Sequence, residues 1–505
     1  MLLQNNNQEN SNRQRQAVYV FILLAVFFSV FAARAYFKAD SYSDTYSYYV
    51  LRNVESIQRD FVPLVDDRLS SATRFDFSEA VFFYLLAFFG FVFGNTYLWV
   101  FVNLAASSIV FAVFLISKTT TGNIPVALFT SFMSGFIAIF FSKTINSLSQ
   151  YAFLIPGVFF LIYFLININK KKSNVAAFSA LFIFLLLLNP SVAAFITGLF
   201  IYLVLLKIEK MSITSTEADV SFFSLFFSLW FYLLMFKSLL SEAGYSAIWQ
   251  NIPKQILELY FSRTNIIDTL YLIGIIPSFA GLYVIYTRLF ERKSKQIYVI
   301  ISFALADIAL FAFKLINLEL GLMFLGVIMT LLFADFFHFF MSYLQKTKFS
   351  FLKWPAFMLV FLLFFLSSVF PSLSLALSEA GTSITQQEID ALRFLAGKAP
   401  GVVVAAPEEG YLVEYFAKKK PLLDYNFLFT PKTTQRYEDI KIIFTSAISS
   451  KVLELMDKYD ARYIVFSDYA REKYNITRLA YTRDSYFSLI YNNSAVYIYS
   501  LNTTA

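Results

Sequence analysis

The chain has 505 residues, of which 58% are hydrophobic, 15% are charged and 63 are phenylalanine, and its formal charge is +7. A soluble domain is about 45–50% apolar and about 25% charged, so this composition excludes an ordinary soluble enzyme and a disordered chain. The absence of cysteine excludes disulfides, the single histidine, His338, excludes a site of several histidines, and the small net charge gives no sign of nucleic-acid binding.

Twelve apolar blocks reach as far as residue 371, and most are long enough to cross a bilayer core of roughly 30 Å. They cover residues 17–36, 79–94, 97–117, 124–142, 151–167, 174–188, 191–207, 220–240, 266–287, 296–314, 318–340 and 354–371. The first block follows a polar tail without a clear small-residue cleavage site, so it is interpreted as an anchor rather than a removed signal peptide.

The short basic loops indicate the orientation of these blocks, because lysine and arginine gather on the cytoplasmic side of a membrane protein. Four basic loops are placed in the cytoplasm with the N-terminus: residues 170–172, 207–210, 288–295 and 346–353. An even number of crossings must then precede residue 170, yet five apolar blocks lie there. The shortest of them, 79–94, is therefore predicted to be a re-entrant or interfacial segment, which leaves about eleven crossings.

The sequence thus predicts an α-helical polytopic protein of the plasma membrane with a cytoplasmic N-terminus. Residues 1–371 form its transmembrane domain, with an external loop at 37–96, and residues 372–505 form an extracytoplasmic α/β domain. The N-x-S/T sequons of the chain all fall in the domain that is placed outside: Asn475, Asn492 and Asn502.

Short apolar strands alternate with helical segments in the C-terminal domain, which is the pattern of a small α/β layer fold. The predicted elements are a strand at 402–406, a helix at 408–418, a strand at 421–424, a helix at 449–459, a strand at 462–467 and a hairpin at 486–501. No internal repeat at a fixed period is evident in the chain, which disfavours an inverted-repeat transporter.

The first external loop carries the strongest candidate for chemistry. A carboxylate soon after a transmembrane helix lies at the outer headgroup level, where Asp44 could hold a divalent cation against a lipid phosphate. The residues that follow suit a helix in the interface, and Arg52 lies near the Asp44 face of that helix, where it could pair with phosphate. The alternative interpretation makes Asp44 an N-cap and the nearby tyrosines an aromatic belt. Residues 66–68 of the same loop are interpreted as a solvated turn.

The run from Asp44 to Glu55, D-x-Y-x-Y-Y-x-x-R-x-V-E, resembles the first external loop of the oligosaccharyltransferase catalytic subunit family, where such an aspartate binds metal. Residues 405–415 and 421–427 are similar to the W-W-D-Y-G-Y segment of that family and to the short strand with D-x-N after it. The layout also matches, with about a dozen helices, a large first external loop and an external α/β domain. The resemblance implies the C-type glycosyltransferase fold, which uses lipid-linked sugar donors.

The sequence departs from the family where the resemblance places the acceptor site. Ala406, Pro407 and Glu408 stand where the family has two tryptophans and an acid that help grip the acceptor. Only the acid is kept, so the resemblance assigns substrate binding to Glu408 and its neighbour Glu409 and puts recognition of a sequon in doubt. A glutamate of the fifth external loop of the family corresponds to Glu258.

The metal site of the family is also incomplete in this chain. Gln150 and Ala152 stand at the two acid positions that complete that site. The resemblance implies Mg²⁺ or Mn²⁺ held by Asp44 and Gln150, and the loss of two charges weakens such a site because a glutamine offers one neutral oxygen and an alanine none.

The resemblance implies transfer of a sugar or glycan from a polyprenyl-phosphate carrier to a protein or glycan acceptor at the outer membrane face. Asp44 with Asp40 is assigned the base that activates the acceptor, and Arg52 or Lys143 the charge compensation of the leaving phosphate. The predicted partners are the lipid-linked donor, the acceptor and membrane lipids, without nucleic acid. Two alternatives stay open: a non-catalytic scaffold of the same fold that binds lipid or a glycoprotein, which the missing acids favour, and a transporter.

Ionisable residues inside the apolar blocks are functional candidates by default. Asp307 and Lys314 lie two helical turns apart on one face, and a buried pair or a contact with Glu319 is predicted there. Asp335 and His338 lie near the cytoplasmic end of their block and are interpreted as capping or snorkelling groups.

Overall fold

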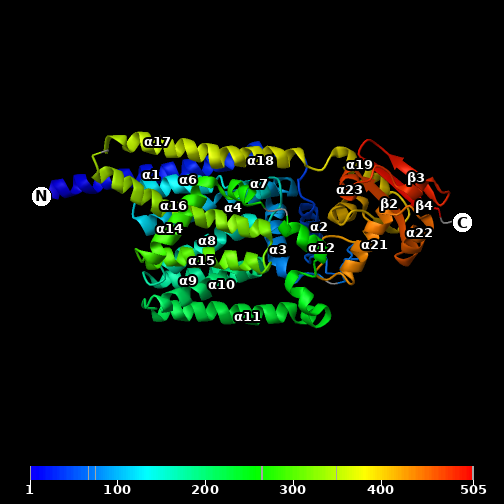
Figure 1. Cartoon of the computed structure of the whole chain (residues 1–505), viewed down its shortest axis with the longest axis horizontal. Coiled ribbons are helices and arrows are strands. Elements are labelled where there is room, and N and C mark those ends of the chain that lie inside the picture. Colours follow the sequence, from blue (N-terminus) through cyan, green and yellow to red (C-terminus); the bar gives the residue numbers. More distant parts are fainter. Residues whose placement is uncertain (1, 66, 74, 263–264, 349, 503–505) are drawn as a thin grey trace. The chain divides into compact units, whose positions relative to one another are not determined.

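The structure is a computed structural model that describes all residues except 1, 66, 74, 263–264, 349 and 503–505 (Figure 1). The chain divides into two compact units, each of which is described by itself. The first unit contains Met1–Lys38, Trp99–Leu234 and Arg263–Gly381, and the second contains Ala39–Leu98, Met235–Ser262 and Thr382–Ala505. In the described part of the chain, all strands lie in the second unit.

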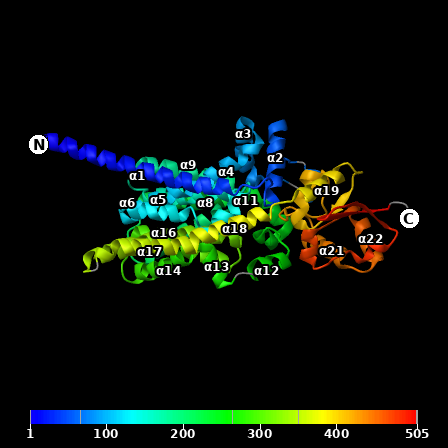
Figure 2. The ribbon, with the colours of Figure 1, turned by 90° about the horizontal axis from the view of Figure 1, so that it is seen from above.

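Apolar helices build the first unit, because a backbone in lipid must satisfy its hydrogen bonds internally. They are α1 (Leu2–Tyr36), α4 (Leu98–Ser107), α5 (Ile109–Thr121), α6 (Ile124–Ser134), α7 (Ala138–Ile145), α8 (Tyr151–Ile166), α9 (Lys172–Leu188), α10 (Ala193–Ile208), α11 (Ser215–Ala243), α13 (Ile266–Ile273), α14 (Ile275–Phe290), α15 (Lys295–Ala312), α16 (Leu318–Lys346), α17 (Lys353–Phe364) and α18 (Phe370–Gly381). The long helices run alongside one another (Figures 1 and 2). Asparagines start some of them, since the side chains of Asn123 and Asn317 accept hydrogen bonds from the first turns of α6 and α16.

The helix lengths agree with a polytopic membrane protein. Among the described residues, seven helices are long and apolar enough to cross a membrane, or nine if each of two bent pairs counts as one span. The bent pairs are α6 with α7, at 49°, and α13 with α14, at 97°. Three further apolar helices are shorter, and they cover Phe77–Phe93, Tyr151–Ile166 and Lys172–Leu188. The predicted α-helical polytopic class is therefore confirmed, whereas the number of eleven crossings stays a prediction.

Small residues let the helices of the first unit approach closely. A Cβ atom on Gly198 of α10 would lie 2.4 Å from the ring of Phe303 of α15, and one on Gly157 of α8 would lie 2.6 Å from Leu185 of α9. Close van der Waals packing of this kind holds helices together in lipid, where the hydrophobic effect gives little drive between them. Phenylalanine rings fill the space around these contacts, as Phe195 and Phe303 do with centroids 5.0 Å apart.

The second unit starts with two helices of the segment 37–96, which is predicted to be an external loop: α2 (Tyr46–Asp60) and α3 (Ala80–Phe93). The rings of Tyr49 and Phe83 meet at 5.7 Å between these helices, and the Gln58 amide donates to Asn95 Oδ1 at 2.8 Å. The apolar block 79–94 therefore packs on the helix that follows Asp44, and its position in the membrane stays a prediction.

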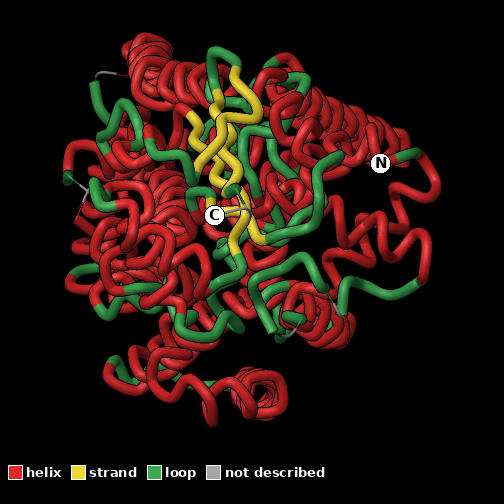
Figure 3. The backbone as a smooth tube through the Cα atoms, turned by 90° about the vertical axis from the view of Figure 1, so that its right-hand side faces the viewer, coloured by secondary structure: helices red, strands yellow, loops and turns green. Residues whose placement is uncertain are grey.

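A four-stranded mixed sheet forms the centre of the C-terminal part of the second unit (Figure 3). Its strands are β1 (Val402–Val404), β2 (Ala461–Ser467), β3 (Phe487–Asn492) and β4 (Val496–Leu501), in the order β1-β2-β4-β3. β1 pairs with β2 in parallel, and the other two pairings are antiparallel. Helices α12 (Lys254–Ser262), α19 (Gln386–Ala396), α21 (Thr433–Thr445), α22 (Ser449–Lys458) and α23 (Asp468–Tyr474) complete this unit.

The structure corrects three details of the predicted α/β domain. The strand expected at 421–424 is a single bridge between Pro421 and Val403. The helix expected at 408–418 is a 3-10 turn at Pro407–Glu409, one α turn at Gly410–Leu412 and a π turn at Val413–Ala417. Helices α19, α21 and α23 were not among the predicted elements, because short amphipathic segments give a weak periodic signal.

Candidate functional site

Asp44 lies directly before α2 in the second unit. Thr45 is the N-cap of α2 and makes no side-chain cap bond, while the Asp44 carboxylate accepts a hydrogen bond from the Ser47 hydroxyl in the first turn. The hydroxyl of Ser41 donates to the carbonyl of Ile384 at 2.7 Å, which holds the start of the loop. Asp44 is partly buried, whereas Asp40 is exposed. Asp44 thus stands close to the N-cap position of the alternative interpretation, with its carboxylate on the first turn of the helix.

Arg52 of α2 is the centre of a buried ion network. Its guanidinium pairs with Asp67 Oδ1 at 2.7 Å and with the carboxylate of Glu414, and only 7% of the side chain is exposed. The turn at 66–68 was expected to be solvated, and that expectation is wrong for Asp67, because the buried guanidinium needs a counter-charge. Asp66 lies outside the described residues.

A second carboxylate, Asp424, lies beside this pair and is also fully buried. It accepts hydrogen bonds from Ser70 Oγ at 3.0 Å, from the Ser71 backbone at 2.9 Å and from the Asn426 backbone at 2.9 Å. Burial raises the pKa of Glu414 well above its ordinary value, the charge of Asp424 raises it further, and Arg52 opposes the rise. Arg52, Asp67, Glu414 and Asp424 are called the Arg52 cluster below.

Aromatic stacking joins the same two segments. Tyr49 of α2 stacks on Tyr411 with ring centroids 4.8 Å apart, and Tyr48 meets Phe416 at 5.0 Å. Such pairs contribute about 0.5–1.5 kcal/mol beyond the area they bury. Helix α2 and the segment 410–417 therefore form one packed element within the second unit.

Gly410 is required where this segment passes the stretch around Asp424. A Cβ atom at position 410 would lie 2.6 Å from the Asp424 Cα and 2.9 Å from the Leu423 carbonyl, both of which are backbone atoms that cannot rotate away. The glycine of the family segment is thus kept here for close approach of two backbones.

Gly410→Ala is expected to destabilise the second unit by about 1–3 kcal/mol, because the backbones must separate. Pulse proteolysis of the full chain in urea measures the change. Gly397→Ala is the matched control, since Gly397 has a φ of −76° and a Cβ there would meet its nearest atom at 3.7 Å. Equal stability of the two variants would contradict the requirement for glycine at 410.

The two carboxylates assigned to the acceptor are both held by the protein. Glu408 pairs with Lys473 at 2.6 Å. Glu409 accepts from the backbone N–H of Ala406 at 3.3 Å, and burial raises its pKa to about 8. Their role in substrate binding stays a prediction.

Glu258 lies on α12 and is 59% exposed, with Lys254 as an i,i+4 partner at 3.7 Å. An exposed pair of this kind contributes about 0.3–0.5 kcal/mol. The predicted role of Glu258 in binding substrate therefore rests on the resemblance alone.

The remaining predicted residues lie in the first unit. Lys143, at the end of α7, pairs with Glu379 at 2.7 Å and with Glu319 at 3.4 Å. Gln150 is buried at the N-cap of α8, and Ala152 is fully buried within that helix. The predicted site residues are thus divided, with Lys143 and Gln150 in the first unit and Asp40, Asp44, Arg52, Glu258, Glu408 and Glu409 in the second.

Sequence reasoning missed a buried cation, Arg34, near the end of α1. Its guanidinium donates to Asn103 Oδ1 at 2.8 Å and to Thr144 Oγ1 at 2.5 Å, and it lies over the ring of Phe141 at 5.2 Å. Arg34 is 1% exposed and has no carboxylate partner in the described part of the chain. A charged residue near the end of the first apolar block was the available signal.

Asp44 and Gln150 are the residues that the resemblance assigns to a divalent metal. Among the described residues, no group of three or more His, Asp or Glu side chains is placed to hold a metal ion. Mg²⁺ is usually held by one or two carboxylates together with waters and substrate phosphate. Asp44 offers one carboxylate and Gln150 one neutral oxygen, so Mg²⁺ or Mn²⁺ at these two residues stays a prediction, and no chemical step is assigned to a metal.

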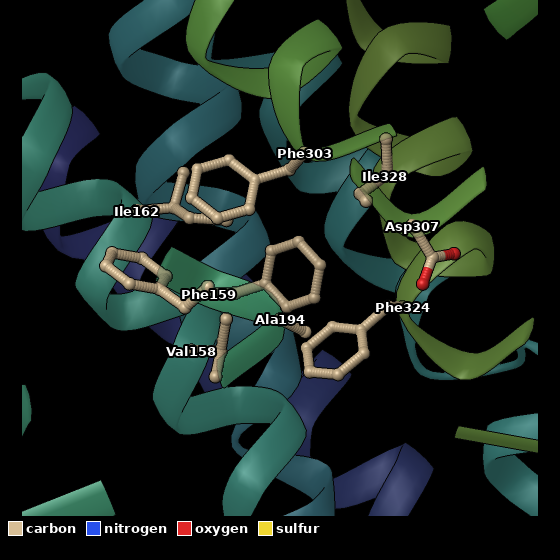
Figure 4. Close-up of a pocket in the computed structure, with 9 residues that line it drawn as sticks. Val158, Phe159, Ile162, Ala194, Phe303, Asp307, Phe324 and Ile328 are labelled. Carbon is tan, nitrogen blue, oxygen red and sulfur yellow. The ribbon is translucent and has the colours of Figure 1, made fainter. Parts of the chain in front are cut away.

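An apolar cavity lies among α8, α10, α15 and α16 of the first unit (Figure 4). It is lined by Val158, Phe159, Ile162, Ala194, Phe195, Phe303, Asp307, Phe324 and Ile328. The carboxylate oxygens of Asp307 are buried and have no hydrogen-bond partner in the described residues, so the predicted pair with Lys314 is not formed. α15 ends at Ala312, and Lys314 has a left-handed φ of 54° that takes it off the helix face of Asp307.

The interpretation of Asp335 as a capping or snorkelling group is also corrected, since its carboxylate forms an interhelical ion pair with Arg288 at 2.6 Å.

No family model matches the chain, and no curated protein matches its sequence. Solved structures do match. The archaeal oligosaccharyltransferase AglB from Archaeoglobus fulgidus, in complex with an inhibitory peptide and a dolichol-phosphate, matches with a TM-score of 0.68 at 12% identity over 97% of this chain and 75% of that chain. An Archaeoglobus fulgidus oligosaccharyltransferase complex with Zn and sulfate gives 0.60 at 13% identity over 94% and 73%. ArnT from Cupriavidus metallidurans bound to undecaprenyl phosphate gives 0.53 at 10% identity over 97% and 98%.

These likenesses show the fold. The chain has the oligosaccharyltransferase-like C-type glycosyltransferase fold, as the two motif resemblances predicted. Almost the whole chain takes part in the match, including its C-terminal part, so the fold extends over both compact units.

Proposed function

We propose that this protein is a membrane glycosyltransferase that transfers a sugar or glycan from a polyprenyl-phosphate carrier to a protein or glycan acceptor at the outer face of the plasma membrane. The observation that carries the proposal is the fold, which matches two kinds of protein over 97% of this chain, one in complex with a dolichol-phosphate and the other bound to undecaprenyl phosphate. The N-terminus is cytoplasmic and the C-terminal domain extracytoplasmic in this proposal, as the basic loops predict.

Asp44 is the residue assigned to the acceptor. It stands at the start of α2, and its carboxylate is oriented by the Ser47 hydroxyl. A positioned carboxylate can accept the proton of an attacking hydroxyl or amide. Asp40 lies four residues before Asp44 in the same loop and is exposed. The bond that breaks joins the anomeric carbon to the lipid phosphate, whose developing negative charge needs a cation.

Both cations predicted for that phosphate already have counter-charges. Arg52 is paired with Asp67 and Glu414, and Lys143 with Glu379 and Glu319. Arg34 has only neutral hydrogen-bond partners among the described residues, but it is almost completely buried. This arrangement favours the second candidate function, a non-catalytic protein of the same fold that binds lipid or a glycoprotein.

Asp44→Asn is expected to lower the rate of sugar transfer about a hundredfold, because the amide cannot accept the proton. The assay follows loss of labelled sugar from a polyprenyl-phosphate carrier in proteoliposomes. Asp60→Asn is the control, since Asp60 lies at the other end of α2 and is 53% exposed beside Arg59.

The outcomes separate the two candidate functions. Transfer by the unaltered protein that falls in Asp44→Asn and not in Asp60→Asn supports the enzyme. Full transfer by Asp44→Asn would contradict the role assigned to Asp44. If the unaltered protein binds polyprenyl phosphate but transfers no sugar, the result supports the non-catalytic scaffold.

A further inference from the structure

The sequons of the C-terminal domain differ in the hydrogen bonds that their side chains make. An N-x-S/T sequon is modified on the asparagine amide, and its hydroxyl residue is read by the transferring enzyme, so both groups must be accessible. The structure describes both residues of two sequons, at 475–477 and 492–494, and the asparagine of the third, Asn502.

Asn475 lies on an exposed turn directly after α23. It ends that helix in the left-handed conformation, with φ 52° and ψ 49°, and its backbone N–H donates to the carbonyls of Arg471 and Glu472. Asparagine tolerates this conformation at a helix end better than most residues, which explains its presence there. The turn is therefore held by its backbone, and the side chain is not needed to form it.

The two reactive positions of this sequon face solvent. Asn475 and Thr477 are exposed, and neither side chain makes a hydrogen bond to another described residue, whereas Ile476 between them packs on the core of the domain. Both side chains line an open hollow together with Asp468, Arg471, Glu472 and Ile476. The amide and the hydroxyl are thus presented on a surface with room beside them.

The other two sequons are held by the fold. Asn492 is the last residue of β3, and the Ser494 hydroxyl of its sequon donates to the side-chain oxygen of Gln387 at 2.7 Å. The residue between them, Asn493, donates to the carbonyl of Gln387 at 2.9 Å. Asn502 donates its amide to the carbonyl of Ser485 at 2.7 Å. Asn492 and Ser494 are exposed, but reading the Ser494 hydroxyl or modifying the Asn502 amide requires breaking a hydrogen bond that the native domain makes.

We propose that Asn475 is an N-glycosylation site of this protein, and that it is modified in preference to Asn492 and Asn502. In the reaction, the Asn475 Nδ2 forms a bond to the anomeric carbon of a lipid-linked oligosaccharide and loses one proton. The bond between that carbon and the lipid phosphate oxygen breaks, and the lipid phosphate leaves with the electron pair. An oligosaccharyltransferase of the same membrane catalyses the transfer, so the inference does not require this chain to be an enzyme.

The test uses the full chain, produced in a host whose membrane contains a sequon-specific oligosaccharyltransferase. Peptide mass spectrometry is expected to find glycan on the peptide that contains Asn475. Asn475→Gln and Thr477→Ala should each abolish this glycan, and Thr477→Ser should keep it because the hydroxyl is retained. Asn492→Gln and Asn502→Gln should leave the glycan unchanged, so these two variants are the matched controls.

The absence of cysteine allows an independent control of topology. Ala447→Cys lies on an exposed loop of the C-terminal domain, and Lys171→Cys lies in a loop predicted to be cytoplasmic. A membrane-impermeant maleimide should label position 447 in intact cells and position 171 only after permeabilisation.

External labelling of position 447 with an unmodified Asn475 would overturn the proposal, and so would glycan found on Asn492 or Asn502 in place of Asn475. Labelling of position 447 only after permeabilisation would overturn it as well, because the domain would then lie on the wrong side of the membrane.

Discussion

Arg52→Met is expected to destabilise the second unit by about 3–5 kcal/mol, because it removes the only cation from a buried group of carboxylates in the Arg52 cluster. Glu414 and Asp424 are fully buried, and Asp67 is 12% exposed, so none of them regains full hydration when the guanidinium is lost. Methionine keeps the unbranched apolar stem, so the change tests the charge more than the packing. Pulse proteolysis in urea on the full chain measures the difference.

Arg59→Met is the matched control, since Arg59 lies on the same helix with 74% of its side chain exposed, beside Asp60. A surface pair of this kind contributes about 0–1 kcal/mol. The double variant Arg52→Met with Glu414→Gln should recover part of the loss, because it removes one of the uncompensated acids. Equal stability of Arg52→Met and Arg59→Met would show that the buried network is not needed for the fold of this unit.

Rising pH is expected to destabilise the second unit between about pH 4.5 and pH 8 through Glu409. Burial raises the pKa of this carboxyl from an ordinary value of 4.5 to about 8. In this window the folded protein keeps the proton and the unfolded chain releases it, so the contribution is complete below pH 4.5 and is lost as pH rises through about 8. The loss amounts to a few kcal/mol, because one pKa unit corresponds to about 1.4 kcal/mol and the side chain is partly exposed.

Glu409→Gln should flatten the stability curve in this window, since glutamine keeps the shape and does not ionise. Unfolding of the full chain by urea at pH 5, 6.5 and 8 measures the curve. Glu454→Gln, an exposed position on α22, is the control and should leave the curve in place. An unchanged pH dependence in Glu409→Gln would assign the loss of stability to other groups, of which Glu414 is the first to examine because its pKa is raised in the same direction.

The apolar blocks predicted most of the helical architecture because membrane helices satisfy their own hydrogen bonds, so each span is encoded locally. The strands β1 and β2 were also predicted, since both are short apolar runs of β-branched residues. The π turn at Val413–Ala417 was missed, and its Phe416 packs on Tyr48, a long-range contact that no local periodicity reports.

The candidate site was predicted less completely than the fold. Arg52 was singled out from its position near Asp44, but its partner Glu414 lies 362 residues further along the chain, and no local pattern reports a contact of that kind. Arg34 was missed for the same reason, because its acceptors Asn103 and Thr144 lie 69 and 110 residues away. Charge type and position in a loop predict which residues carry chemistry, whereas the counter-charges come from folding.

The second unit is built from three separate stretches of the chain, and this has a consequence for biosynthesis. Its first stretch is synthesised after α1 but before the other helices of the first unit, and its last stretch only after them. Until the C-terminal residues have emerged, α2 has neither Glu414 nor Tyr411 as a partner, and its buried face stays open. Such non-local pairing is slow and leaves apolar surface exposed while it waits. The loop that carries Asp44 therefore reaches its final form as one of the last steps of assembly, after the chain is complete.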